Sequence, residues 1–257
     1  MLTVDNITVR YGPCDVLAGI SFTLFAGELA VLVGSNGSGK TTLIKSLNGT
    51  LPTVEGSVKL DGRSLEEYSR RELAQRIAVV AQENETKFPV TVLDFVLAGR
   101  FASGSAFGWE VPEDIAIAEK ALAECGLDRF GSRLMNELSG GERQRVVMAR
   151  AVAAGSSILL LDEPTANLDL THQAMMFSLV RSRCTGLGHS AVVITHDLNL
   201  AAEFADRIVM LRQGRIVAAG TADEVLNAAN ITQVFGVNAL LDTNPASGKV
   251  RVTPIFG

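Results

Sequence analysis

The sequence has few cysteines, and they lie far apart. Cys14, Cys125 and Cys184 form no Cys-x-x-Cys pair, and their number is odd. This excludes a disulfide framework of the kind that small secreted domains use, as well as a zinc site built from paired cysteines. We therefore interpret all three as buried or incidental thiols in a protein of a reducing compartment.

The chain also lacks long apolar runs and an excess of basic residues. No apolar run approaches the roughly 20 residues that a membrane-spanning helix needs, and the first residues show no basic stretch followed by the apolar core of a signal peptide. The formal net charge is -5, which argues against a broad basic face for nucleic acid. We expect a cytosolic protein without a nucleic-acid partner, which would work at a membrane only through another chain.

Aromatic side chains make up only 5% of the residues, with one tryptophan and two tyrosines. The ring of Tyr11 could stack on a purine, although an isolated tyrosine at the end of a strand is more often a packed edge residue. The tryptophan, Trp109, lies near Phe101 and Phe107 in a stretch that also contains two glycines. This stretch predicts either a loop that contacts a partner or a local hydrophobic cluster, and the sequence leaves both open.

The clearest motif in the chain is a glycine-rich loop between a predicted strand and a predicted helix. The apolar residues 29–33 predict a buried strand before the loop, and residues 41–47 predict a helix after it. This context is the one in which such a loop binds nucleotide phosphates. The loop has the pattern Gly, four residues, Gly-Lys-Thr, and we call its nine residues the phosphate loop: Gly34, Ser35, Asn36, Gly37, Ser38, Gly39, Lys40, Thr41 and Thr42.

The residue types of the phosphate loop explain how it would bind its ligand. Glycines let the backbone come close to the ligand, so that N–H groups of the loop and of the helix start point at phosphate oxygens. Lys40 is expected to reach the β- and γ-phosphates, and the hydroxyl of Thr41 is expected to bind Mg²⁺. The motif therefore predicts a nucleotide as the ligand.

Two further predicted strands end in residues that could carry chemistry. The apolar residues 158–161 are followed by Asp162 and Glu163, and the strand at 191–195 is followed by His196. Ligands bind at the carboxyl edge of a parallel sheet, so these side chains should meet there. Burying two adjacent carboxylates without a cation is costly, which makes Mg²⁺ the economical partner for Asp162. For His196 the residue type leaves a structural and a functional role equally open.

Two other positions have both a functional and a plain interpretation. Gln82 follows the apolar residues 77–81 and could ligate Mg²⁺, although by itself an ordinary polar residue at a strand end is the better interpretation. The second position is the start of a helix that runs to about Ala154, where a hydroxyl and free N–H groups at the positive end of the helix dipole would make another anion site. A plain serine cap explains the same residues, which are Ser139, Gly140, Gly141 and Glu142.

Taken together, these motifs resemble those of the ATP-binding subunit of ABC transporters, in that family's order. The resemblance covers the chain from Leu2 to about Gly220 and continues more weakly to the end. The phosphate loop resembles the Walker A loop, and residues 159–163 resemble Walker B. The remaining matches are Leu138–Gln144 to the signature sequence, Gln82 to the Q-loop glutamine, Asn167-Leu168-Asp169 to the D-loop, His196 to the switch histidine and Tyr11 to the adenine-stacking aromatic.

The resemblance implies an α/β fold of the P-loop NTPase class. Such a fold has a mixed or parallel core sheet, an N-terminal antiparallel β subdomain and an inserted α-helical subdomain. We expect a single domain over 1–257, with the core in 1–82 and 157–229, the helical subdomain in 83–156 and a short appendage in 230–257. The helical subdomain would receive a membrane permease.

The resemblance also implies a mechanism. Two copies would dock head to tail and enclose two ATP molecules, with the Ser139–Glu142 turn of one copy facing the phosphate loop of the other and Asp169 in the D-loop. Asp162, Thr41 and Gln82 would hold Mg²⁺. Glu163 would act as general base on the attacking water, with Gln82 nearby, and His196 would hold the γ-phosphate and that water.

The run Leu168–Gln173 is similar to one in importers of iron-siderophore, haem and cobalamin, and the segments Leu97–Arg100 and Phe235–Val237 resemble the same group. His172 within the run is interpreted as a residue of a helix surface. The resemblance implies a polytopic permease and, indirectly, an extracytoplasmic substrate-binding protein, with the chain on the inner face of the membrane. The alternatives are a soluble ABC ATPase with a non-transport role and a nucleotide switch that does not hydrolyse, which Glu163 and His196 disfavour.

Overall fold

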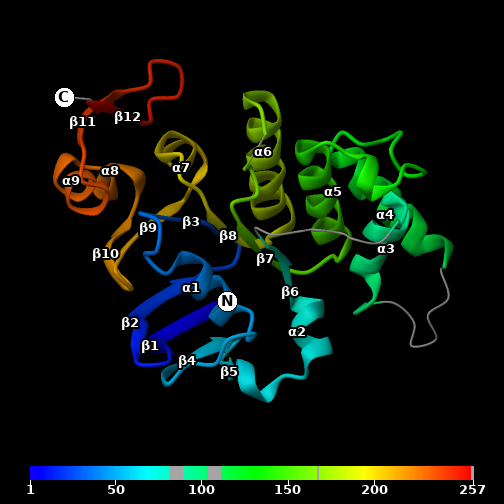
Figure 1. The fold of residues 1–257 in the computed structure, drawn as a ribbon, viewed down its shortest axis with the longest axis horizontal. Coiled ribbons are helices and arrows are strands. Elements are labelled where there is room, and N and C mark those ends of the chain that lie inside the picture. The colour runs from blue at the N-terminus through cyan, green and yellow to red at the C-terminus, as the bar shows by residue number, and fades with distance from the viewer. Residues whose placement is uncertain (82–88, 104–110, 167, 256–257) are drawn as a thin grey trace.

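The computed structural model describes residues 1–81, 89–103, 111–166 and 168–255. A six-stranded mixed sheet forms its centre, in the order β10-β9-β3-β8-β7-β6 (Figure 1). Neighbouring strands run parallel except for β10, which returns antiparallel to β9 through a tight hairpin. The strands are β3 (Leu29–Gly34), β6 (Ile77–Val80), β7 (Ile158–Asp162), β8 (Ser190–Ile194), β9 (Arg207–Arg212) and β10 (Arg215–Gly220).

A second, antiparallel sheet is built from the N-terminal part of the chain. Its order is β2-β1-β4-β5, from β1 (Leu2–Tyr11), β2 (Cys14–Leu24), β4 (Glu55–Leu60) and β5 (Arg63–Ser64). Helix α1 (Lys40–Leu47) contributes Leu43, Ile44 and Leu47 to a hydrophobic core that this sheet shares with one face of the central sheet. The sheet and α1 therefore stabilise the strand that leads into the phosphate loop.

Helices cover the other face of the central sheet and form the larger of the two hydrophobic cores. They include α3 (Val92–Leu97), α4 (Pro112–Glu124), α5 (Gly140–Ala153), α6 (Leu170–Leu187) and α7 (Leu198–Phe204). The 3-10 turns η2 (Ala98–Arg100) and η3 (Met135–Glu137) belong to this part. The turn η1 (Leu65–Glu67) and the short helix α2 (Arg70–Arg76) instead place Leu65 and Leu73 at the core that the antiparallel sheet shares. In Figure 1, α3, α4 and α5 lie together on one side of the molecule. The predicted fold class is confirmed, including the antiparallel β subdomain and the helical insertion.

The C-terminal region differs from the sequence-based expectation. Thr221 N donates to Glu224 Oε2 over 2.8 Å, in a capping box that opens the single turn α8 (Ala222–Val225). Asn227 then caps a further helix, α9 (Ala228–Phe235), by accepting from Asn230 N over 2.9 Å. The expected boundary between core and appendage, placed before Asn230, therefore falls inside α9.

A β-hairpin follows α9 within the expected short appendage. It pairs β11 (Asn238–Thr243) with β12 (Val250–Ile255). The side chain of Asn199 on α7 holds its outer edge, because the amide donates to Val252 O over 3.1 Å and accepts from Val252 N over 2.8 Å. One asparagine thus satisfies both backbone groups of Val252, as a neighbouring strand would.

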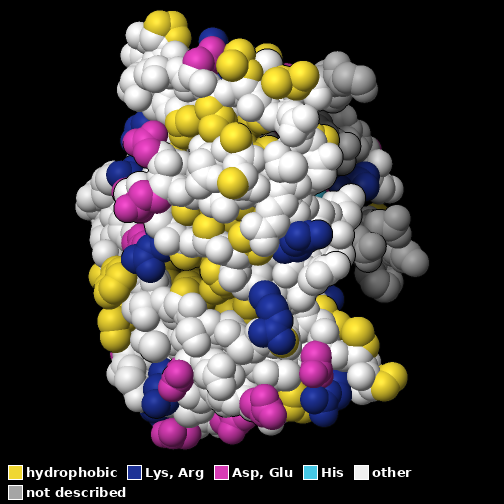
Figure 2. Space-filling model, turned by 90° about the vertical axis from the view of Figure 1, so that its left-hand side faces the viewer, with side chains coloured by type: hydrophobic (Ala, Val, Ile, Leu, Met, Phe, Trp, Pro, Cys, Tyr) yellow, Lys and Arg dark blue, Asp and Glu magenta, His cyan; other side chains and the backbone are white. Residues whose placement is uncertain are grey.

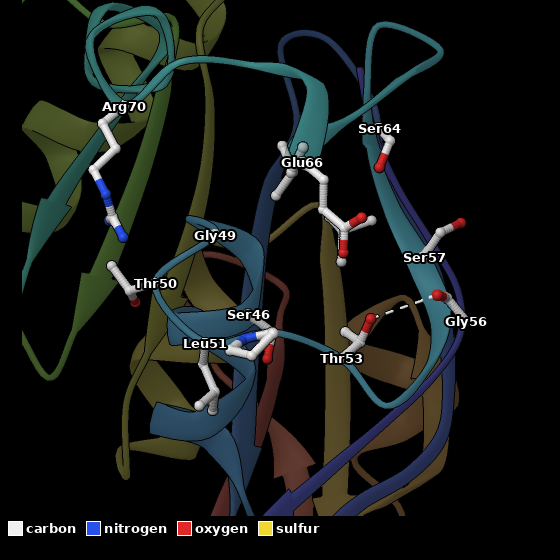
Figure 3. Close-up of a pocket in the computed structure, with 13 residues that line it drawn as sticks. Ser46, Gly49, Thr50, Leu51, Thr53, Gly56, Ser57, Ser64, Glu66 and Arg70 are labelled. Carbon is white, nitrogen blue, oxygen red and sulfur yellow. Dashed lines mark hydrogen bonds between the residues drawn. The ribbon is translucent and has the colours of Figure 1, made fainter.

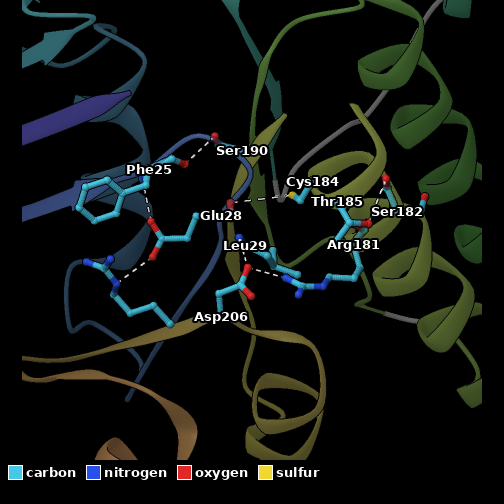
Figure 4. Close-up of polar contacts among 10 residues, drawn as sticks. Phe25, Glu28, Leu29, Arg181, Ser182, Cys184, Thr185, Ser190 and Asp206 are labelled. Carbon is cyan, nitrogen blue, oxygen red and sulfur yellow. Dashed lines mark hydrogen bonds and ion pairs between the residues drawn. The ribbon is translucent and has the colours of Figure 1, made fainter. Parts of the chain in front are cut away.

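A polar network fixes β3 at the end opposite the phosphate loop (Figure 4). Glu28 is only 8% exposed, and its carboxylate accepts from Arg207 Nε over 2.8 Å and from Phe25 N over 2.7 Å. Asp206 accepts from Leu29 N over 2.9 Å and from Arg181. Since Arg207 opens β9 and Leu29 opens β3, these bonds hold the two parallel strands side by side and help position the phosphate loop.

The surface carries both signs of charge. On the face shown in Figure 2, the Lys and Arg side chains at the left and lower edges lie beside Asp and Glu side chains, and the few near the centre and right are separate from one another, in the part of the chain that the structure describes. The face in Figure 2 therefore offers no continuous basic area of the kind that nucleic acid binding uses.

No described helix is both long enough and apolar enough to cross a bilayer.

Candidate active site

The phosphate loop connects β3 to α1 and follows the backbone path that its glycines allow. Gly34 has a φ of +156° and Gly39 a φ of +101°, both in the region that favours glycine. A Cβ on Gly34 would lie 2.3 Å from the carbonyl oxygen of Leu211, and one on Gly39 would lie 2.6 Å from Leu17. The loop borders a cavity of about 350 Å³ that is lined by Val16, Asn36, Gly37, Ser38, Gly39, Lys40, Thr41, Thr42 and Glu163.

Polar groups of the phosphate loop are buried without full satisfaction. Lys40 is 6% exposed, and its amine donates to the carbonyls of Gly34 over 2.9 Å and Ser35 over 3.1 Å. Burial lowers the pKa of Lys40, and the charges of Glu163 and Asp162 oppose this shift. The hydroxyl of Ser38 is buried without a hydrogen-bond partner among the described residues. A phosphate oxygen would satisfy this hydroxyl and give Lys40 a counter-charge.

Asp162 and Thr41 form an oxygen-rich corner beside the loop. Asp162 is 3% exposed, and its Oδ1 has no hydrogen-bond partner within the described part of the chain. Burial raises the pKa of Asp162, while a hydrogen bond with the hydroxyl of Thr41 acts in the opposite direction. Elsewhere in the described ranges, no three His, Cys, Asp or Glu side chains gather as a metal site. A hard cation that takes some oxygens from a phosphate, as Mg²⁺ does, fits this donor set.

Glu163 and His196 meet at the same edge of the sheet. Asp162 at the end of β7 pairs with Ile194 at the end of β8, so Glu163 and His196 both follow at the carboxyl ends of neighbouring strands. Nε2 of His196 lies 2.7 Å from Oε1 of Glu163. Glu163 has a φ of +50°, which is rare for a residue other than glycine and is found at functional sites. The structure brings the two side chains together as the sequence predicted.

The Ser139–Glu142 turn opens α5 as a capping box. Ser139 Oγ accepts from Glu142 N over 3.3 Å, and Ser139 N donates to Glu142 Oε2 over 2.8 Å. Hydrogen bonds from Ser139 lower the pKa of Glu142. Ser139 and Gly140 are exposed, and no residue of the turn lines the cavity at the phosphate loop of its own chain. The plain cap is therefore present, and it leaves the helix start accessible to another molecule.

The remaining predicted residues are more scattered. Asp169 caps α6 by accepting from His172 N over 2.9 Å, and it also contacts the ring of His172 over 2.7 Å. Tyr11 ends β1 with a side chain that is 48% exposed, and it does not line the cavity at the phosphate loop. Gln82 and Asn167 lie outside the described residues.

Two contacts at the phosphate loop were not predicted from the sequence. Val16 on β2 lines the cavity. Gly214, in the turn between β9 and β10, donates its N–H to Ser38 O over 3.0 Å and accepts from Ala18 N over 2.9 Å. A Gln-Gly pair favours a tight turn, but neither residue type signals a contact with a loop about 175 positions earlier in the chain.

Comparison with known proteins identifies the family. The model of the ABC transporter family matches residues 17–166, which is more than half of the 257 residues. A hemin import ATP-binding protein of Streptomyces coelicolor is 40% identical over 99% of this chain and 90% of its own length. An iron(3+)-hydroxamate import ATP-binding protein of Bacillus subtilis is 34% identical over 96% of this chain and 92% of its own length.

Solved structures agree with these sequence matches. A metal-chelate type ABC transporter in an inward-facing conformation superposes with a TM-score of 0.85 at 28% identity, covering 99% of this chain and 97% of that chain. The dimeric ATP-binding cassette MJ0796, in a post-hydrolysis state bound to ADP and phosphate, superposes with a TM-score of 0.77 at 29% identity, covering 86% and 99%. This chain therefore belongs to the ABC transporter family and is one of its ATPase subunits.

Proposed function

We propose that this chain hydrolyses ATP to power the import of a metal chelate through a membrane permease. One observation carries the proposal: Glu163 and His196 are in contact at the edge of the sheet where β3 leads into the phosphate loop. Beside them lies the buried Asp162, whose Oδ1 has no hydrogen-bond partner among the described residues. A general base, a positioning histidine and a cation ligand thus converge on one phosphate site, which is more than nucleotide binding alone requires.

The phosphate loop holds the nucleotide in this proposal. N–H groups of the loop and of the first turn of α1 donate to phosphate oxygens, and Lys40 exchanges the carbonyls of Gly34 and Ser35 for the β- and γ-phosphates. Thr41, Asp162 and Gln82 hold Mg²⁺. When bound, Mg²⁺ neutralises the negative charge of the phosphate oxygens, which lowers the barrier to attack on the γ-phosphate.

Glu163 is the general base and His196 positions the reaction in this proposal. The Glu163 carboxylate takes the proton of the attacking water, so this proton ends on a carboxylate oxygen. His196 already contacts that carboxylate over 2.7 Å. It holds the γ-phosphate and the water in line, with Gln82 nearby. We assign different roles to the two carboxylates because their positions differ. Asp162 is buried beside Thr41 and suits a cation ligand, whereas Glu163 lines the cavity and suits a base.

The active site is completed by a second copy of the chain in this proposal. The start of α5 is exposed and does not line the cavity at its own phosphate loop, which supports its use by a partner. Ser139, Gly140, Gly141 and Glu142 of one copy face the γ-phosphate on the other, and Asp169 lies at the contact between the copies. Tyr11, exposed at the end of β1, stacks on the adenine.

The cargo and the partners follow from the relatives. The hemin and iron(3+)-hydroxamate import proteins and the metal-chelate type transporter support haem, a ferric siderophore or cobalamin as the class of cargo. The chain lies in the cytoplasm on the inner face of the membrane, bound to a polytopic permease that receives cargo from an extracytoplasmic binding protein. The helical subdomain receives the permease, and Phe101 there is 85% exposed; Phe107 and Trp109 lie outside the described residues.

The test is a pull-down of a tagged copy from native membranes in gentle detergent. The proposal predicts a polytopic membrane protein in stoichiometric amounts, and uptake of haem, ferric siderophore or cobalamin that requires this partner and Glu163. Recovery with ribosomes, with nucleic acid or with no membrane protein would contradict it and would favour a soluble ABC ATPase with a non-transport role.

A further inference from the structure

A second cavity lies beyond the loop that follows α1, and it shares no residue with the cavity at the phosphate loop (Figure 3). Its volume is about 330 Å³. Its walls come from the end of α1 and the loop at 49–53, from β4 and β5, from η1 and from the first residue of α2. The antiparallel sheet and the phosphate-loop helix thus enclose a space that the hydrolysis of ATP does not use.

The cavity has an apolar floor and the size of a small-molecule site. Val58 and Leu65 are 6% and 5% exposed, and Leu51 and Pro52 adjoin them in the lining. A volume of about 330 Å³ is at the lower end of the roughly 300–1,000 Å³ of ligand pockets. The floor therefore suits a short aliphatic chain rather than a large ring system.

Two side chains of opposite charge line this cavity and do not pair with each other. Glu66 and Arg70 both line it, and neither forms an ion pair or hydrogen bond within the described residues. Their neighbours behave differently, because Arg63 pairs with Glu67 over 3.5 Å and lies 3.8 Å from Glu72. Charge partners are thus available in this segment, yet Glu66 and Arg70 remain outside the pairing.

The two side chains reach over different parts of the loop. In Figure 3, Arg70 extends toward Thr50 and Glu66 extends toward Thr53, whose hydroxyl bonds to Gly56 O over 3.5 Å. A ligand that meets both charges needs a carboxylate at one end and an ammonium at the other, with several bonds between them. We propose that the cavity binds a small linear zwitterion of the ω-amino acid class, with its carboxylate on Arg70, its ammonium on Glu66 and its methylenes on Leu51, Val58 and Leu65.

The loop under this ligand is firmly tied to α1. The hydroxyl of Thr50 donates to Lys45 O over 3.0 Å, and the N–H groups of Thr50 and Leu51 donate to the same carbonyl, each over 3.0 Å. Thr50 also lines a cavity on the other side, together with Thr41 and Asp162. The zwitterion would therefore contact the loop that borders the nucleotide site, and the proposal does not depend on the cargo or on the permease.

The test is calorimetric titration of the purified chain with 6-aminohexanoate. Glu66 and Arg70 are both exposed, so each charge contact should contribute modestly. We expect saturable binding, with hexanoate and hexylamine several-fold weaker, since each lacks one of the two charge contacts. Glu66→Gln and Arg70→Gln should each weaken binding several-fold and leave ATP affinity unchanged. Glu67→Gln, in the same segment but outside the lining, should bind as the wild type does.

Three results would overturn the proposal. They are no saturable binding by the wild type, equal binding of hexanoate or hexylamine, and unchanged binding in both Glu66→Gln and Arg70→Gln. A labelling experiment separates a free ligand from a protein partner, with Ser64→Cys in the cavity lining and the exposed Cys14 replaced by serine. Protection of Ser64→Cys from maleimide by 6-aminohexanoate supports the proposal. Protection in the membrane-bound assembly without any zwitterion would show that a partner chain fills the cavity, and would contradict it.

Discussion

At the scale of single residues, the proposed mechanism depends on residues that the fold holds in energetically unfavourable conformations or environments. Glu163 has a φ of +50° and contacts His196, and Asp162 buries a carboxylate oxygen without a hydrogen-bond partner among the described residues. Such costs persist when the surrounding structure fixes the residues, and they are typical of sites that act on a ligand. They lead to two predictions.

Glu163→Gln should bind ATP as the wild type does and lose its turnover. The amide keeps the size and can still contact His196, but it cannot take a proton from water. Steady-state phosphate release should fall by at least about a hundredfold, which is the lower end of what a general base contributes, while equilibrium nucleotide binding stays unchanged. Glu203→Gln on the surface of α7 is the control, and turnover like that of the wild type in Glu163→Gln would remove Glu163 from the role of base.

Asp162→Asn should make the metal-free protein more stable while abolishing hydrolysis. Replacing a buried carboxylate by a neutral amide removes a desolvation cost of about 1 kcal/mol, which urea denaturation measures. Because burial raises the pKa of Asp162 above its ordinary 3.8, the wild type loses stability as pH rises from 3.8 to the raised pKa, the range in which only the unfolded chain ionises. The gain from asparagine should therefore be present at neutral pH and shrink in acid. A variant that is less stable at neutral pH would contradict this interpretation.

The sequence predicted most of the single residues that meet at the site, but not their whole surroundings. Asp162, Glu163 and His196 could be placed together because the carboxyl ends of parallel strands share one edge. Val16 and Gly214 could not, because their contacts with the phosphate loop depend on which strands become neighbours across long stretches of chain. The roles of Tyr11 and Asp169 remain predictions, since the structure shows their positions and not their ligands.

At the scale of secondary structure elements, the start of α5 is a structural cap and a proposed binding site at once. A second helix, α2, opens with the same residue pattern, because Ser69 Oγ accepts from Glu72 N over 3.2 Å and Ser69 N donates to Glu72 Oε2 over 2.7 Å. The two capping boxes therefore allow the structural and the functional role to be separated.

Ser139→Ala and Ser69→Ala should cost similar stability but differ in activity. Loss of a serine cap typically costs about 1 kcal/mol, which urea denaturation should show for both variants. Only Ser139→Ala should lose ATP turnover, because only that helix start faces a partner's γ-phosphate in our proposal. Equal turnover in the two variants would reduce the Ser139–Glu142 turn to a plain cap.

Glu28→Gln should destabilise the central sheet without touching the site. It removes the charge that Arg207 needs at a position that is 8% exposed, and we expect a loss of about 2 kcal/mol in the free energy of unfolding. Asp242→Asn, which breaks the exposed ion pair with Arg251, is the matched control and should leave stability nearly unchanged. If both variants unfold at the same urea concentration, the Glu28 network does not stabilise β3 and β9.

Elements were predictable where the chain shows a clear period, and less so elsewhere. The apolar runs of β3, β7 and β8 indicated strands at nearly the observed bounds. Helix α6 buries only Met176, Phe177, Val180 and Cys184 over 18 residues, so its apolar stripe gives a weak signal. The hairpin of β11 and β12 was missed because its strands are short and half exposed, and its anchor is Asn199, a residue more than 30 positions away.

At the scale of the whole molecule, one chain carries two positions that the sequence predicts to bind anions, and the Ser139–Glu142 turn does not line the cavity at the phosphate loop of its own chain. This separation agrees with the head-to-tail pairing that the family resemblance implied. The expected boundary between core and helical subdomain at 82/83 lies outside the described residues. In the head-to-tail pair that we propose, the phosphate loop of one chain and the Ser139–Glu142 turn of the other contact the same nucleotide.

Mixing two inactive variants tests directly whether one active site is shared between two copies of the chain. Lys40→Ala removes the phosphate-loop lysine and Ser139→Ala removes the signature serine, so each variant alone should be unable to hydrolyse ATP. In a head-to-tail pair of the two, one site combines the intact phosphate loop of one chain with the intact Ser139 of the other. We predict that mixing restores phosphate release, and that the rate of release rises with the fraction of mixed pairs. Mixtures as inactive as the separate variants would contradict a site shared between two copies.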